Sequence, residues 1–174
     1  MRILITGGAG FVGSNLALLL KRDRPADEVI ALDNLKRRGS ELTLSRLRAG
    51  GVEFQHGDIR NPEDLAEVGP VSLLIECSAE PSVHAGCDGN PSYVLNTNLG
   101  GTLNCLEHAR RHAADFVFLS TSRVYPIVPL SSLPLVSNGT RFMIPEGQRG
   151  EGWSERGISE AFPLSGHRSL YGAT

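Results

Sequence analysis

The feature that most constrains this chain is the glycine-rich segment after its first apolar stretch. Residues 2–6, Arg-Ile-Leu-Ile-Thr, are typical of a short buried strand, and residues 7–13 read Gly-Gly-Ala-Gly-Phe-Val-Gly. Counted from Gly8, the spacing is G-x-G-x-x-G, and a helical pattern follows directly. Such a turn lets main-chain N–H groups approach a phosphate, and a helix start offers unpaired donors and a partial positive charge. The segment therefore predicts a dinucleotide pyrophosphate site.

The residues after the glycines support this interpretation. Apolar side chains recur there at helical spacing, and we expect them to form the buried face of a helix. They are Val12, Leu16, Leu19 and Leu20. Residues 29–33, Val-Ile-Ala-Leu-Asp, then predict a second buried strand. Strand, turn, helix and strand together make a βαβ unit of a parallel sheet.

Asp33 closes the second strand, twenty positions after Gly13. A carboxylate at that place can accept hydrogen bonds from the hydroxyls of an adenosine ribose. The basic residues Lys36, Arg37 and Arg38 follow, and they could attract the 2′-phosphate of NADP. Because the charge of Asp33 would repel that phosphate, the sequence favours NAD over NADP.

Composition excludes several classes of protein. The chain has 174 residues, enough for one core, and its net charge of −2 offers no broad surface to nucleic acid or an anionic membrane. No apolar run could span a bilayer, and the first strand begins at residue 2, which leaves no room for a signal peptide. Cys77, Cys87 and Cys105 lack metal-site spacing, so we expect reduced cysteines, no metal and a cytoplasmic protein.

Strand and helix patterns alternate along the first 120 residues. Further strands are predicted over residues 52–56, 71–77 and 115–120. Helices are predicted over residues 41–49, from Pro62 after an Asn61 cap, and from Pro91 after an Asn90 cap to about His112. This alternation predicts the α/β class, with a Rossmann-type doubly wound parallel sheet and helices on both of its faces.

The predicted helix that ends near His112 contains two glycines. Its buried side is expected to consist of Val94, Leu95, Leu99, Leu103 and Leu106. Gly100 and Gly101 lie inside it, and each costs about 1 kcal/mol relative to alanine. We therefore expect something close by, a neighbouring helix or a cofactor, to press on the helix backbone at these glycines.

The character of the sequence changes at Pro126. Proline, serine and glycine accumulate, and no period persists to about residue 165. We divide the chain into an NAD-binding core over residues 1–125, a long insertion loop over 126–165, and the start of a helix over 166–174. The chain stops at Thr174 without a closing strand, so we expect a fold incomplete at the C-terminus and a fragment of a longer protein.

Six segments in this order resemble the extended short-chain dehydrogenase/reductase family, the NAD-dependent epimerases and dehydratases of nucleotide sugars. They are residues 6–13, 33–35, 57–60, 98–102, 120–125 and 171–174. Within the family, residues 120–126, 140–142 and 154–160 are most similar to the branch that inverts C2 of CDP-linked sugars.

The chain departs from the family pattern at two places. The dehydratase branch has an Asp-Glu pair after its catalytic threonine, where this chain has Ser122 and Arg123. Because arginine cannot exchange a proton as a carboxyl group does, the resemblance argues against dehydration. The family often has His-Leu-Ala-Ala after the fourth strand, where this chain has Glu76-Cys77-Ser78-Ala79.

The resemblance implies a role for each matching residue. The pyrophosphate would be held by Gly7, Gly10, Phe11, Val12 and Gly13. The adenosine end would be held by Asp33, Asn34, Arg37, Asp58 and Ile59. The channel toward the nicotinamide would be lined by Ala79, Asn98 and Ser120. The catalytic pair would be Thr121 and Tyr171.

The resemblance also implies a mechanism. Tyr171 would take a proton from a sugar hydroxyl while hydride moves to NAD, and Thr121 would hydrogen-bond the same oxygen. A lysine four positions after the tyrosine favours the phenolate in this family, and that position falls just past Thr174. We therefore expect the 174-residue chain by itself to be nearly inactive.

The implied substrate is a nucleotide-diphosphate sugar, with a CDP-hexose favoured. A homodimer or a higher oligomer stays open. So do two other functions: a 4-epimerase or 4-reductase of nucleotide sugars, and a non-catalytic module that senses a dinucleotide.

Overall fold

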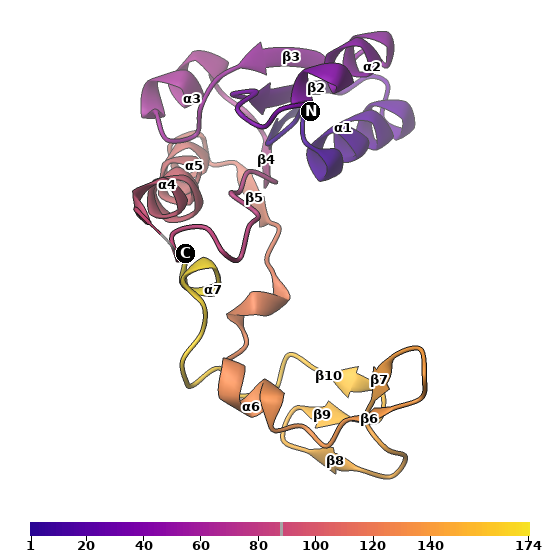
Figure 1. Ribbon diagram of the computed structural model, residues 1–174. Coiled ribbons are helices and arrows are strands. Elements are labelled where there is room, and N and C mark those ends of the chain that lie inside the picture. The colour runs from indigo at the N-terminus through magenta and orange to yellow at the C-terminus, as the bar shows by residue number, and fades with distance from the viewer. Residues whose placement is uncertain (88) are drawn as a thin grey trace. The chain divides into compact units, whose positions relative to one another are not determined.

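The computed structural model describes residues 1–87 and 89–174. It divides into two compact units (Figure 1). The first unit contains residues 1–120 together with Thr174, and the second contains residues 121–173. The division falls directly after Ser120, five residues before the end of the core that we predicted from the sequence.

The first unit is built on a five-stranded parallel sheet in the order β3-β2-β1-β4-β5. The strands are β1 (Arg2–Thr6), β2 (Glu28–Asp33), β3 (Glu53–His56), β4 (Leu73–Glu76) and β5 (Asp115–Phe118). Ile5 in the central strand lies opposite Ala31 on one side and Ile75 on the other. The strand order reverses beside β1, and in such sheets this is where ligands bind, at the carboxyl ends of the strands. The predicted fold class is confirmed.

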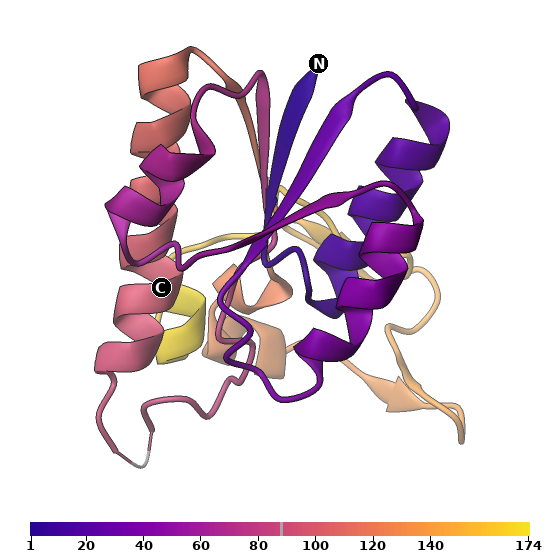
Figure 2. The same ribbon diagram turned by 90° about the horizontal axis from the view of Figure 1, so that it is seen from above.

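Helices cover both faces of this sheet (Figure 2). One face carries α1 (Phe11–Asp23), the 3₁₀ turn η1 (Ser40–Thr43) and α2 (Leu44–Ala49). The other face carries α3 (Pro62–Val68) and a long helical segment made of α4 (Ser92–Val94), the π-helix η2 (Leu95–Gly100) and α5 (Gly101–His112). Two apolar clusters result, one on each face of the sheet.

The buried face of α1 is as predicted only in part, since Leu16 and Leu20 pack against the core but the other two predicted residues do not. Val12 and Leu19 are exposed, whereas Gly13, Ser14 and Ala17 are buried. A Cβ at Gly13 would lie 2.2 Å from the carbonyl oxygen of Gly7, so the helix start is too close to the turn for a larger residue. Small residues therefore face the sheet. The spacing of the leucines did not predict this, because periodicity carries no information about how closely a helix approaches a sheet.

For the long helical segment the prediction is confirmed at Val94, which is buried, and wrong at three leucines. Leu99, Leu103 and Leu106 are 46%, 57% and 43% exposed, while Thr97, Asn98, Gly101, Cys105 and His108 are buried. Residues Leu95 to Gly100 of this segment form a π-helix, and the buried residues follow one helical face through it. The side facing the sheet is therefore the polar and small-residue side.

The two helix glycines have different surroundings. A Cβ at Gly101 would lie 2.3 Å from Cδ1 of Ile59, so the expected close neighbour exists there. At Gly100 the nearest atom to such a Cβ would be the carbonyl oxygen of Leu95, at 3.9 Å, which is ordinary contact. A close protein neighbour is therefore confirmed for Gly101, whereas the described residues provide none for Gly100.

Two smaller expectations also changed. The helix predicted over residues 41–49 is divided into η1 and α2. Asn61 is the residue before α3, and Pro62 opens the helix, but the Asn61 side chain accepts no N–H of that helix. Its amide instead donates to Asp64, whose Oδ2 also accepts the N–H of Asp58 at 2.7 Å.

Short elements make up the second unit. Those within residues 126–165 lie where the sequence predicted a loop, and the last one lies where it predicted the start of a helix. They are η3 (Ser122–Val124), α6 (Ile127–Ser131), the antiparallel pair β6 (Val136–Ser137) and β7 (Phe142–Met143), the three-stranded sheet β8 (Arg149–Gly150), β9 (Trp153–Ser154) and β10 (Gly157–Ile158), and α7 (Leu170–Ala173). Strands of two residues are too short for alternation to reveal. Phe162 is buried and contacts Tyr125 edge to face, with ring centroids 5.6 Å apart.

Candidate functional site

A cavity of about 390 Å³ lies where the strands of the first unit end. It is lined by most of the residues that the sequence assigns to a cofactor. Those residues are Gly7, Gly10, Phe11, Val12, Gly13, Asp33, Asn34, Arg37, Asp58, Ile59 and Ala79. The structure therefore brings together side chains and backbone from β1, α1, β2 and the segments after β3 and β4.

The glycine turn forms one wall of the cavity. Gly7 has φ of +62°, a left-handed conformation that favours glycine, and its N-terminal neighbour is the last residue of β1. A Cβ at Gly7 would lie 2.7 Å from the Cys77 carbonyl oxygen, so a side chain there would collide with the end of β4. The Gly10 N–H donates to the Gly7 carbonyl at 2.9 Å and closes the turn.

The start of α1 points unpaired donors at the same place. The first backbone hydrogen bond at this end runs from the Ser14 N–H to the Gly10 carbonyl, at 3.0 Å. The N–H groups of Phe11, Val12 and Gly13 precede it, and no side chain caps them. The first turn carries no acidic residue, so its partial positive charge is available to an anion.

Asp33 is held by backbone donors at the end of β2. Its Oδ2 accepts the Ala9 N–H at 3.1 Å, and its Oδ1 accepts the Leu35 N–H at 2.8 Å. Leu35 adopts φ of +53°, which is uncommon for a leucine and turns the chain sharply after the strand. Each carboxylate oxygen retains a further lone pair for a ligand hydroxyl.

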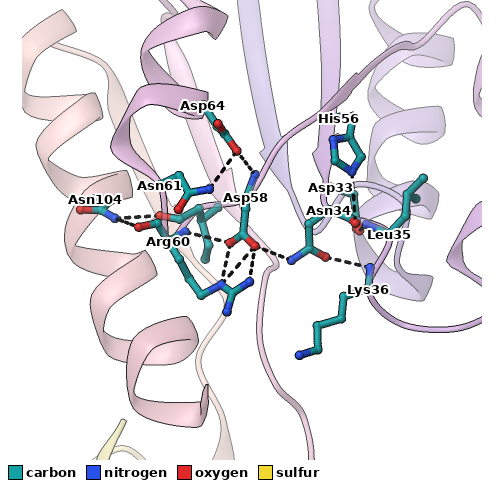
Figure 3. Close-up of polar contacts among 11 residues, drawn as sticks. Asp33, Asn34, Leu35, Lys36, His56, Asp58, Arg60, Asn61, Asp64 and Asn104 are labelled. Atoms are coloured by element: carbon teal, nitrogen blue, oxygen red, sulfur yellow. Dashed lines mark hydrogen bonds and ion pairs between the residues drawn. The ribbon is translucent and has the colours of Figure 1, made fainter. Parts of the chain in front are cut away.

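Asp58 is the centre of a polar network that Figure 3 shows. Its carboxylate accepts the Arg60 Nε at 2.9 Å and the amide of Asn34 at 2.9 Å. The Arg60 guanidinium lowers the pKa of Asp58 to about 2, with a further contribution from Asn34. The network links the segments after β2 and β3, and it fixes the adenosine end of the predicted site.

Asn98 lies behind the cavity wall. It is 8% exposed, and its side chain binds the backbone of Glu80 on the segment after β4. Glu80 and Ala79 line the cavity, whereas Asn98 does not. The structure thus places Asn98 as a support of the wall that was expected to contain it.

Sequence reasoning missed one cavity residue with a distinctive contact. The ring of Tyr93 lies under the Lys36 ammonium, 3.5 Å from Nζ to the ring centroid, and 5.1 Å from the Arg60 guanidinium carbon. All of these atoms belong to the first unit, and Tyr93 and Lys36 both line the cavity. No local pattern in the sequence singles out Tyr93, because its partners come from segments more than thirty residues away.

The two residues assigned to catalysis lie in the second unit. The Thr121 Oγ1 accepts the Arg123 N–H at 3.2 Å and so caps η3. Tyr171 belongs to α7, which packs against η3. A Cβ at Gly172 would lie 2.1 Å from the Arg123 carbonyl oxygen, so glycine permits this close approach. Thr121 and Tyr171 therefore belong to two helical turns that touch.

Ser120 is the last residue before the division between the units and does not line the cavity. Among the described residues, no three His, Cys, Asp or Glu side chains are grouped as a metal site would require. Cys77, Cys87 and Cys105 are free thiols. Within the same residues, no helix is both long and apolar enough to cross a membrane.

Residues 3–139 match the NAD dependent epimerase/dehydratase family. The chain belongs to this family. The family expected from the sequence motifs is therefore confirmed. It is a family of NAD-dependent enzymes, and members of this fold have been solved with NAD bound.

Two curated relatives and one solved structure illustrate the similarity. CDP-paratose 2-epimerase from Salmonella typhi is 37% identical over 131 residues, which cover 72% of this chain and 38% of that protein. dTDP-glucose 4,6-dehydratase from Mycobacterium tuberculosis is 36% identical over 126 residues, which cover 72% of this chain and 38% of that protein. UDP-glucose 4-epimerase from Stenotrophomonas maltophila, with bound NAD and formylated UDP-arabinopyranose, has a TM-score of 0.63 at 24% identity, covering 72% of this chain and 38% of that one.

The matched residues include the first unit, apart from its first two residues and Thr174, and the start of the second. The match to the family includes every cavity residue named above and Thr121, and it ends before Tyr171. The chain spans about 38% of the length of the curated relatives it matches.

Proposed function

We propose that this chain is the NAD-binding part of a nucleotide-sugar epimerase that works by transient oxidation of the sugar. The observation that carries the proposal is the cavity at the reversal of strand order, with the glycine turn on one wall and Asp33 on another. A pyrophosphate and an adenosine ribose require these two features side by side.

The residues of the cavity fit NAD on three counts. The turn has no Cβ at Gly7, Gly10 or Gly13, so phosphate oxygens can approach the backbone. The start of α1 supplies N–H donors without a competing acid. Asp33 is fixed by two backbone N–H groups and can accept ribose hydroxyls, while its charge disfavours a 2′-phosphate.

When bound, NAD would supply the hydride acceptor and donor for the sugar carbon. In this proposal Tyr171 holds and releases the proton of the reacting hydroxyl, and Thr121 hydrogen-bonds the same oxygen. A tyrosine phenol has an ordinary pKa near 10, so the base needs a cation beside it. The family's lysine, four positions after the tyrosine, is the group we assign to that task in the whole protein.

We further propose that the substrate is a CDP-linked hexose and that the inverted carbon is C2. The support is the similarity to CDP-paratose 2-epimerase and the identity of residues 120–126. The sequence identity to a dehydratase is almost as high, at 36%, but Ser122 and Arg123 occupy the positions of the acid pair in that branch. Neither side chain can supply the carboxyl group that dehydration requires.

The experiment has a binding part and a chemical part. Titration of the 174-residue chain with NAD and with NADP tests the cavity, and the proposal expects NAD to bind more tightly. The whole protein is then supplied with CDP-paratose in deuterated water, and the product is analysed by NMR for inversion at C2. Inversion without net use of added cofactor supports the proposal. Inversion at C4, net consumption of NADH or NADPH, or bound NAD without any turnover would each replace it with one of the alternatives.

A further inference from the structure

A buried acid lies at the end of β4, immediately before the cavity wall. Glu76 is the last residue of the strand and is 1% exposed, and Cys77, Ser78 and Ala79 after it line the cavity. Its partner across the ladder to β1 is Thr6, the residue before the glycine turn. Glu76 is thus joined through the backbone to both walls of the site.

The hydrogen bonding of Glu76 is incomplete. Its Oε1 accepts the Thr102 hydroxyl at 2.8 Å, and its Oε2 has no partner among the residues that the structure describes. Burial raises the pKa of Glu76 to about 7, and the bond from Thr102 only partly opposes this. A buried carboxylate oxygen without a donor is costly, whereas a neutral carboxyl group is far less so.

The Thr102 hydroxyl has two acceptors within reach. It lies 2.8 Å from Glu76 Oε1 and 2.7 Å from the Asn98 carbonyl oxygen, yet it carries one proton. An ionised Glu76 attracts that proton more strongly than a carbonyl does. A neutral Glu76 can donate its own proton to the Thr102 oxygen, which leaves the Thr102 proton for Asn98. The charge of Glu76 therefore determines whether the Thr102 hydroxyl donates to Glu76 or to the Asn98 carbonyl oxygen.

Asn98 connects the Thr102 hydrogen bond to the wall of the cavity. Its Oδ1 accepts the Glu80 N–H at 2.8 Å, and its Nδ2 donates to the Glu80 carbonyl at 3.3 Å. Ala79 and Glu80 line the cavity. The contacts run from the end of β4 to α5, then to the π-helix, and back to the segment that follows β4.

We propose that Glu76 is a positioning residue for the cofactor site, which in its neutral form holds Ala79 and Glu80 in place through Thr102 and Asn98. The consequence for NAD rests on the function proposed above, whereas the link from Glu76 to Glu80 does not. When Glu76 ionises, Thr102 turns to the carboxylate, and the free Oε2 draws water toward the end of β4. The segment at Glu80 then loses its support.

Within residues 1–87 and 89–174, the other groups that face Glu76 do not titrate in the same range. Cys105 on α5 is buried, and burial together with the Glu76 carboxyl raises the pKa of its thiol. Burial also raises the pKa of Cys77 to about 11. Both thiols therefore stay neutral between pH 6 and pH 8. Thr6 on β1 and Phe118 on β5, the ladder partners of Glu76, carry no charge.

The test measures the Glu80 amide directly, in the 174-residue chain and without cofactor. Hydrogen exchange at that amide is followed by NMR from pH 6 to pH 8 and corrected for intrinsic exchange. We expect its protection to fall about tenfold, in step with the neutral fraction of Glu76. Glu76→Gln keeps the size without the charge and should hold the pH 6 protection throughout. Thr102→Val should abolish protection at every pH, and Thr102→Ser should behave as the parent chain does.

The same variants are titrated with NAD. The expected result is about tenfold weaker binding at pH 8 than at pH 6 in the parent chain, and a flat profile in Glu76→Gln. His56→Gln is the control, because the His56 ring lies near the cavity, 3.3 Å from the Asn34 carbonyl oxygen, and it should keep the parent profile. A Glu80 amide whose protection falls equally in Glu76→Gln, or does not fall in the parent chain, overturns the inference. NAD that binds at no pH refutes the proposed cofactor site, and the exchange profile still decides the role of Glu76.

Discussion

The side chain of Asn98 forms two hydrogen bonds with the backbone of Glu80: its Oδ1 accepts the Glu80 N–H at 2.8 Å, and its Nδ2 donates to the Glu80 carbonyl at 3.3 Å. This pairing joins the π-helix to the segment after β4, eighteen residues earlier in the chain. Because the contact is part-buried, water replaces it poorly when it is lost. The relationship makes Asn98 a support of the cavity in which we propose that NAD binds.

Replacing Asn98 should therefore weaken cofactor binding without a change of any cavity residue. Asn98→Ala leaves both Glu80 backbone groups unpaired, at a cost of about 1–3 kcal/mol. We expect roughly tenfold weaker binding of NAD, measured by calorimetric titration. Asn96→Ala is the matched control, since Asn96 is exposed in the same π-helix. Equal loss in both variants would show that the helix, not the contact, is responsible.

The adjacent glycines Gly100 and Gly101 should respond to alanine in opposite directions. Gly100→Ala adds a Cβ that makes only ordinary contact with its surroundings and should raise the free energy of unfolding by about 1 kcal/mol. Gly101→Ala places a Cβ 2.3 Å from Cδ1 of the buried Ile59, and overpacking of this kind costs about 1–3 kcal/mol. Urea denaturation of both variants gives the comparison, and stabilisation by Gly101→Ala would contradict it.

The free energy of unfolding of the chain should depend on pH through the ionisation of Glu76. Its pKa rises from an ordinary 4.5 to about 7 on folding, because burial disfavours the charge. The neutral form is thus favoured in the folded state, so this contribution is complete below pH 4.5 and is lost as the pH rises through 7. The loss is roughly 3 kcal/mol at pH 8. Glu76→Gln should unfold at higher urea than the parent chain at pH 8, and the gap should close near pH 4.5. A constant gap would exclude the titration of Glu76 as its source.

Asp33 should determine the preference between the two dinucleotides. Asp33→Asn removes the charge that repels a 2′-phosphate and weakens the acceptors for ribose hydroxyls. We expect NAD to bind about tenfold more weakly and the ratio of NADP to NAD affinity to rise. Asp23→Asn removes an equal charge from the exposed end of α1 and should leave that ratio unchanged. A ratio that is the same in all three proteins would disprove the assignment of Asp33.

Tyr93 should slow the release of the cofactor through its contacts with two cations. Tyr93→Phe keeps the ring under Lys36, whereas Tyr93→Leu removes it. A cation–π contact at a partly exposed site contributes about 0.5–1 kcal/mol, so we expect a few-fold faster dissociation of NAD in Tyr93→Leu only. Stopped-flow displacement measures the rate. A parallel increase in Tyr93→Phe would assign the effect to the hydroxyl.

The first 60 residues were largely predictable because their signals are local. The glycine turn, the strand before it and Asp33 at the end of β2 lie where the sequence placed them. The buried faces of α1 and α5 were not predictable from leucine spacing. Gly13 is required by the closeness of the Gly7 carbonyl, and Cys105 shares a helix face with Gly101, which packs closely on Ile59. These causes lie in packing between segments, which periodicity within one segment does not contain.

The residues that support the site were likewise not predictable from the sequence. Asn98 belongs to a family motif, but its contact with Glu80 could be recognised only in the folded structure. Glu76 was visible as a departure from the family pattern, but its burial could be seen only in the folded structure. Tyr93 had no signal, because Lys36 and Arg60 reach it from other segments.

The measurement that tests the central claim most directly is an NMR titration of the 174-residue chain with NAD. If the start of α1 holds the pyrophosphate, the amide signals of Phe11, Val12 and Gly13 shift most and saturate together. Gly13→Val places a side chain against the Gly7 carbonyl and should abolish these shifts. Saturable binding that leaves those three amides unmoved, or persists undiminished in Gly13→Val, would contradict the account.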